Sequence, residues 1–167
     1  MKTLYIRQKI VSLNDRFSVT DIDQVVQYTI EGSFIKIPKQ YTIFNASGDE
    51  VAEITRKLIS LLPVFTVDFN AKETITIKKH FSFLKEKLTI EGAGIVLTGD
   101  LFDLHFDIQK DGETIGAIQP KIFSWADTYE LTILNEQYEE MIVALTVAID
   151  RIKEESGSLF SGISLFD

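Results

Sequence analysis

The sequence predicts a mainly β domain in which an antiparallel sheet closes into a barrel around one hydrophobic C-terminal helix. From Leu4 to Ile133, apolar and polar residues alternate in short runs, as they do in strands with one buried face. The stretch from Met141 to Ile149 is apolar except at Thr146, so a helix there has to be buried on all sides. No other helix is predicted, so only a sheet wrapped around this one can bury it, and closure also removes the sheet edges.

The strands are expected to derive partly from a duplicated unit. The pattern lysine, two mostly apolar residues, serine and another apolar residue occurs at residues 9–13, 57–61, 79–83 and 121–125, and an offset of 64 residues extends the match without a gap. The two residues between lysine and serine interrupt the alternation. We therefore expect a corner or bulge at which both face inward. Aligning Lys79 on Lys57 places Asn70 where the other copies have Gly48 and Gly112, which predicts a positive φ there.

The helix is predicted over residues 136–154. Asn135 is a suitable N-cap, acidic residues follow it, and Gly157 comes just after the predicted end. The hydroxyl of Thr146 is expected to bond the carbonyl of Ile142. The tail at residues 159–166 is apolar enough to form a final strand that closes the barrel, so residues 1–167 are expected to form one domain.

Composition narrows the function classes. The chain has 25 acidic and 17 basic residues, a net charge of −8, which argues against general nucleic-acid binding. It has no cysteine, which excludes disulfides and thiolate metal sites. The N-terminal segment lacks the apolar core of a secretory signal, and the apolar part of the helix is too short to span a bilayer. We therefore expect a cytoplasmic protein without a transmembrane segment.

One segment departs from the acidic balance and is the candidate ligand site. Between residues 72 and 87 there are five lysines and two glutamates, and the lysines are Lys72, Lys78, Lys79, Lys85 and Lys87. Such a cluster can bind an anion or a membrane surface. The competing interpretation is a pair of solvated hairpin faces, where lysines also protect strand edges.

Catalytic and metal-binding patterns are weak. His80 and His105 fall in separate predicted strands, and no hydrolase, nucleotide or dinucleotide motif is present. Asp103, His105 and Asp107 share one strand face, but neighbours on a face stand about 7 Å apart, too far for one ion, so we expect a solvated outer face. Trp125 is expected to pack at a corner of the barrel. No enzyme activity, metal or cofactor is expected.

Three segments carry a family resemblance. KLISLLPVF (57–65), KIFSWADTYEL (121–131) and VALTVAIDRI (143–152), in this order, resemble the LURP-one-related family over nearly the whole chain. The resemblance implies the tubby-like fold, a closed antiparallel barrel of about twelve strands around a hydrophobic C-terminal helix. Relatives with this fold include the phosphoinositide-binding tubby domain and the phospholipid scramblases. The basic residues of tubby match no position here, and Ala126 stands where related sequences usually have Gly.

These observations predict a non-enzymatic binding or scaffold domain of the LURP-one-related type. Its partner is expected to be a lipid headgroup, a membrane surface touched peripherally, or another protein. The alternative is a barrel that carries or senses a small apolar ligand beside the helix. The helix weighs against this alternative, because it fills the volume that a ligand would need.

Overall fold

The computed structural model describes residues 1–7, 16–33, 37–70, 73–80, 87–101, 104–121 and 128–163, with the backbone alone at residues 87 and 157–163. The described chain forms twelve strands, which are β1 (Lys2–Arg7), β2 (Arg16–Thr20), β3 (Val26–Ser33), β4 (Gln40–Asn45), β5 (Glu50–Arg56), β6 (Val64–Phe69), β7 (Glu73–His80), β8 (Lys87–Glu91), β9 (Ile95–Asp100), β10 (His105–Lys110), β11 (Glu113–Pro120) and β12 (Thr128–Ile133).

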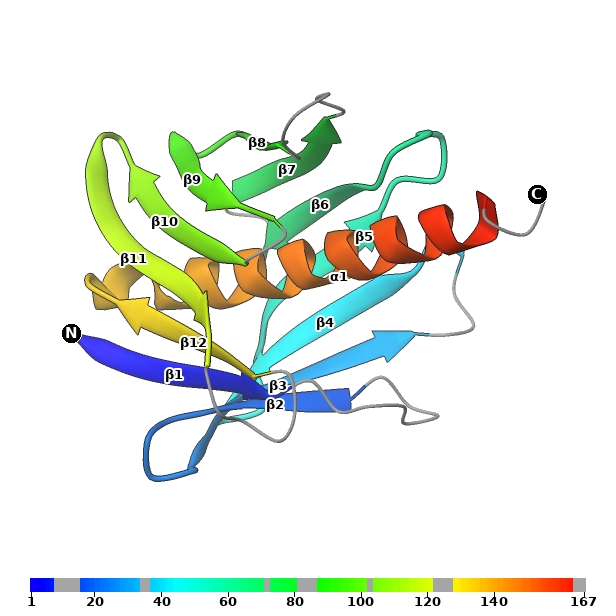
Figure 1. The fold of residues 1–167 in the computed structure, drawn as a ribbon. Coiled ribbons are helices and arrows are strands. Elements are labelled where there is room, and N and C mark those ends of the chain that lie inside the picture. Colours follow the sequence, from blue (N-terminus) through cyan, green and yellow to red (C-terminus); the bar gives the residue numbers. More distant parts are fainter. Residues whose placement is uncertain are drawn as a thin grey trace.

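The strands make one antiparallel sheet that curls into a nearly closed barrel (Figure 1). The hydrogen-bonded order is β8-β7-β6-β5-β4-β3-β2-β1-β12-β11-β10-β9, so β1 joins the first strands to the last. The edge strands β8 and β9 are consecutive in the chain and connected by the short turn at residues 92–94. Their described residues form no paired ladder, so one seam stays open. The predicted mainly β barrel is confirmed.

A single helix runs through the barrel. A 3-10 turn, η1 (Glu136–Tyr138), leads into α1 (Glu139–Ile163). The side chain of Asn135 accepts a bond from the backbone N–H of Gln137 at 3.1 Å, which confirms the predicted cap. The Thr146 hydroxyl donates to the Ile142 carbonyl at 2.8 Å, also as predicted.

The predicted end of the helix is wrong. α1 continues through Gly157 to Ile163, so residues 159–163 are helical and not the expected closing strand. Residues 164–166, the rest of that predicted strand, lie outside the described part of the chain. The physical reason is that an isolated Gly costs a helix only about 1 kcal/mol, too little to end it when the preceding turns are held in place.

The barrel interior is packed with the side chains of α1. Most residues of its first four turns are fully buried, and they meet inward-facing residues of the strands. At Gly116 on β11, an added Cβ would lie 2.7 Å from Cδ1 of Ile142 and 2.5 Å from the Thr132 carbonyl oxygen. Sheet and helix therefore approach so closely that only glycine fits there.

The duplicated unit exists and spans three strands. The bond from the Lys57 N–H to the Val64 carbonyl recurs, 64 residues later, from Lys121 to Thr128, both at 2.8 Å. β4, β5 and β6 thus correspond to β10, β11 and β12. Gly48 and Gly112 share a φ of 87°, and Asn70 has a φ of 43°, which confirms its predicted conformation.

The predicted inward-facing corner is wrong in the repeat copy that the structure describes in full. In residues 57–61, Leu58 is 56% exposed and Ile59 is 101% exposed, so both side chains point to solvent. These residues form the loop between β5 and β6, not a continuous bent strand. The copies at 9–13, 79–83 and 121–125, including Trp125, fall wholly or mainly outside the described residues.

Candidate interaction surface at one end of the barrel

The antiparallel topology gives the barrel two chemically distinct ends. At one end of the barrel lie η1 and the start of α1, and we call this end the entry rim. The odd-numbered strands begin there and the even-numbered strands end there. Odd-numbered strands end at the opposite side, toward which α1 runs, and we call this end the exit rim (Figure 1). The loop between β5 and β6 belongs to the exit rim.

The entry rim is acidic. Its exposed carboxylates come from the turns between strands and from the start of the helix; they are Asp23, Asp49, Glu50, Asp111, Glu113, Glu136 and Glu140. Two lysines, Lys2 and Lys110, are the basic side chains among the described residues of this rim, and both are bound to carboxylates, Glu139 and Asp111.

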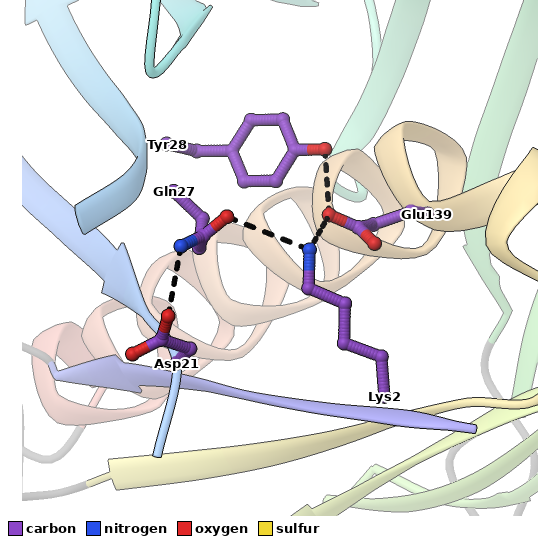
Figure 2. Close-up of polar contacts among 5 residues, drawn as sticks. All are labelled: Lys2, Asp21, Gln27, Tyr28 and Glu139. Atoms are coloured by element: carbon purple, nitrogen blue, oxygen red, sulfur yellow. Dashed lines mark hydrogen bonds and ion pairs between the residues drawn. The ribbon is translucent and has the colours of Figure 1, made fainter. Parts of the chain in front are cut away.

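Lys2 belongs to a polar cluster that fixes the start of α1 (Figure 2). Its ammonium lies 2.8 Å from Glu139, which also accepts a bond from the Tyr28 hydroxyl at 2.9 Å. Burial, together with the negative charge of Glu139, raises the pKa of the Tyr28 hydroxyl, so it stays a hydrogen-bond donor. Gln27 links Lys2 to Asp21 across the cluster. These contacts tie β1 and β3 to the helix.

The exit rim is basic. Its exposed cations lie next to the ends of strands and on the later turns of α1. They are Arg7, Arg16, Lys39, Lys57, Lys121 and Lys153. The exposed carboxylates among its described residues are Glu31 and Glu154, and each is bound to an arginine. Although the protein has a net charge of −8, the exposed positive charge of its described residues is thus concentrated at one end.

Several basic side chains of the exit rim serve the fold. Arg56 contacts Glu155 at 2.6 Å and ties β5 to the helix, while Arg16 contacts Glu31 at 3.3 Å. In contrast, Arg7, Lys39 and Lys57 have no ion pair with any described residue, and Lys121 lies over the ring of Tyr5 at 4.0 Å. Among the described residues, therefore, no carboxylate lies within ion-pair distance of these four cations.

A buried ion pair lies inside the barrel near the exit rim. Asp150 and Arg151 are 6% and 5% exposed, and their charged atoms are 2.5 Å apart. The Tyr129 hydroxyl donates to Asp150 at 2.8 Å, and the Arg151 guanidinium lies near the rings of Phe17 and Tyr41. Burial alone lowers the pKa of Arg151, but the charge and hydrogen bond of Asp150 raise it overall, so the guanidinium stays charged.

The structure separates the lysines of the predicted ligand site. Lys78 and Lys79 are neighbours on β7 and therefore face opposite sides of the sheet; Lys79 is 4% exposed, so it cannot belong to a surface cluster. Lys78 contacts Glu91 at 2.6 Å, and that bond lowers the pKa of the Glu91 carboxyl. Lys87 begins β8 at the exit rim. Lys72 and Lys85 lie outside the described residues.

The two histidines lie on strands that are not neighbours in the sheet and form no catalytic pair. His80 and His105 are exposed on different strands, and Asp107 faces solvent beside His105, as expected for an outer face; Asp103 lies outside the described part. Within the described ranges, no three His, Cys, Asp or Glu side chains are arranged to hold a metal ion. The described part of the chain also contains no helix long and apolar enough to cross a membrane.

Comparisons with known proteins agree with this architecture. The model of the LURP-one-related family matches residues 2–150. The uncharacterized protein YxjI of Bacillus subtilis is 29% identical over 163 residues, which cover 96% of this chain and 100% of that protein. A protein of Arabidopsis thaliana with an X-ray structure has a similar fold, with a TM-score of 0.58 at 10% identity, over 89% of this chain and 91% of that one. The twelve-stranded barrel and its central helix are consistent with the tubby-like fold, and the chain belongs to the LURP-one-related family.

Proposed function

We propose that this chain is a non-enzymatic binding domain whose exit rim engages an anionic partner, either a lipid headgroup, a membrane surface or an acidic face of another protein. The observation that carries the proposal is the segregation of charge. Arg7, Lys39 and Lys57 are exposed at one rim and form no close ion pair with a described residue, although the whole chain is strongly acidic and Glu91 lies near enough to Lys57 for their charges to interact.

The charge distribution also supplies orientation. An anionic surface repels the entry rim and attracts the exit rim, so the barrel approaches it end-on. Each cation near such a surface contributes about 1 kcal/mol, and the attraction weakens within a Debye length of about 10 Å at moderate salt. Arg7, Lys39 and Lys57 together then account for an affinity gain of about a hundredfold at low ionic strength.

Lys78 and Lys87 extend the proposal to the lysine-rich segment. Lys87 begins β8 at the exit rim, and Lys78 lies one strand away on β7. Because Glu91 already neutralises Lys78, we expect Lys78 to add less than the unpaired cations.

The proposal is tested by retention on heparin, a polyanion that reports on positive surface charge. The triple variant Arg7→Gln, Lys39→Gln and Lys57→Gln should elute at clearly lower salt than the natural protein. A charge-matched control alters exposed residues of the entry rim by the same net amount, with Ser47→Glu, Thr114→Glu and Gln137→Glu.

The control triple should elute with the natural protein, because its added charges lie at the end that faces away. If the natural protein is not retained at low salt, or if the two triples shift equally, the exit rim is not an anion-binding surface. A separate Lys78→Gln variant should shift elution by less than one third of the effect of the triple.

A further inference from the structure

We propose that the partner of the exit rim is a lipid bilayer with anionic headgroups, and that the loop between β5 and β6 inserts into it. This inference rests on the proposed function and goes further, because it names the partner and the inserting side chains. It starts from an apolar loop that the basic rim alone does not explain.

The loop presents apolar side chains to solvent. Ile59 is 101% and Leu61 is 99% exposed, and Leu58 is 56% exposed. Scattered single apolar residues are normal on a surface, but three within four residues at the tip of one loop form a local apolar point.

The loop is held at its base, so its tip keeps this exposed position. The Lys57 N–H donates to the Val64 carbonyl at 2.8 Å, and the Ser60 hydroxyl donates to the Lys57 carbonyl at 3.3 Å. Pro63 is buried and packs the returning chain against the barrel. The loop lies at the end of the barrel where the last turns of α1 are found (Figure 1).

A further exposed apolar residue, Ile37, and a further lysine, Lys39, lie beside the loop. The Arg56 N–H donates to the Lys39 carbonyl at 3.1 Å, which places residues 37–39 beside the base of the loop. Ile37 in that segment is 84% exposed, and Lys39 is exposed. An apolar tip flanked by Lys39 and Lys57 is therefore built from two neighbouring strand connections.

A bilayer is the partner whose chemistry fits both parts. Lysines near an anionic leaflet attract it, while side chains such as Ile59 and Leu61 gain free energy on transfer into its apolar region. A free anion would use the cations and leave the apolar tip in water. The acidic entry rim at the opposite end is repelled by the same surface, which favours an end-on insertion of the loop.

Co-sedimentation tests the proposal with vesicles of phosphatidylcholine, alone and mixed with phosphatidylserine. The natural protein should pellet with the anionic vesicles. Ile59→Ser with Leu61→Ser should reduce its partition coefficient about a hundredfold, because each of the two apolar side chains lost is worth about a factor of ten. The matched control Ile22→Ser with Val25→Ser removes exposed apolar residues of the entry rim and should pellet like the natural protein. Since all four residues are exposed, the circular dichroism and urea midpoint of both variants should match those of the natural protein.

Insertion of the loop is measured with a fluorophore attached at one position of the chain. The chain has no cysteine, so Ile59→Cys and Ile22→Cys each give one site for the fluorophore NBD, whose emission rises in an apolar environment. On anionic vesicles, the label at position 59 should brighten several-fold and the label at position 22 should not.

The proposal is overturned if the natural protein stays in the supernatant, if the Ile59 and Leu61 variant pellets unchanged, or if the label at position 59 does not brighten. Heparin retention separates this failure from failure of the proposed function. Retention that depends on the exit-rim cations, without vesicle binding, leaves the anion-binding rim in place and excludes the bilayer as its partner. The Ile59 and Leu61 variant should keep its full heparin retention, because it loses no charge.

Discussion

Removing one partner of the buried ion pair should destabilise the protein far more than removing both. In Asp150→Asn, the nearest anion of Arg151 is lost, while the guanidinium remains 5% exposed inside the barrel. The ion pair from Arg151 to Glu154 at 2.7 Å survives, but Glu154 is largely exposed; the contacts of the guanidinium with the rings of Phe17 and Tyr41 also remain. At an effective dielectric constant of about 20, charges about 4 Å apart attract by about 4 kcal/mol, which agrees with the 3–5 kcal/mol typical of a broken buried pair.

The loss is a large part of the free energy of unfolding, which is about 5–15 kcal/mol for a domain of this kind. Urea unfolding followed by circular dichroism measures it, provided that the slope of free energy against urea is unchanged. Arg151→Met should cost a similar amount, because the buried Asp150 keeps the bond from the Tyr129 hydroxyl but loses its guanidinium contact at 2.5 Å. The double variant should cost at least 2 kcal/mol less than the sum of the two single variants.

The control is Glu154→Gln, which removes the exposed partner of Arg151 and should change stability by less than about 1 kcal/mol. The reasoning is refuted if Asp150→Asn costs less than about 1 kcal/mol, or if the two single variants add within 0.5 kcal/mol. Either result would mean that the charges of Asp150 and Arg151 are not coupled inside the folded barrel.

Two further predictions concern the central helix and the repeat. Leu145→Asp places a carboxylate at a fully buried position and should prevent folding, which the circular dichroism spectrum would show. The control Glu140→Gln, on the exposed start of the helix, should fold normally. A folded Leu145→Asp protein would show that the helix is not central. Asn70→Ala should lower the free energy of unfolding, measured in urea, by about 1 kcal/mol, because Ala is strained at a φ of 43° and the bond to the Glu50 carbonyl is lost. Asn70→Gly should lower it clearly less. Equal losses would show that a residue tolerant of positive φ is not what this position requires.

The strands and the helix could be predicted because their signals are local. Alternation of period two marks strands with one face in the core, and an apolar stretch that begins at an N-cap such as Asn135 marks a buried helix. The end of the helix could not be predicted from Gly157. The end of a helix depends on what its last turns contact. Here Glu155 of the helix contacts Arg56 of β5, which is 99 residues away in the chain.

The candidate site was predicted only in part. Residues 72 to 87 form a cluster of lysines in the sequence. In the structure, its neighbours Lys78 and Lys79 lie on opposite faces of β7, because successive side chains of a strand alternate. The exit-rim cations Arg7, Lys39, Lys57 and Lys121 are far apart in the chain. The signal that would find them is their place in the strand order, since each lies beside the end of an odd-numbered strand or the start of an even-numbered one.

By itself, the sequence determined a mainly β chain, a barrel around one hydrophobic helix, the positive φ of Asn70 and a net negative charge. Those properties follow from residue types and short-range spacing. Only the tertiary structure decided that acidic turns gather at the entry rim, and that cations without an ion pair to any described residue gather at the exit rim. It also decided that Ile59 and Leu61, in a loop of the exit rim, point into solvent. The physical reason is that an antiparallel meander sends alternate connections to opposite ends, so the charge of each end is a sum over segments that are distant in the chain.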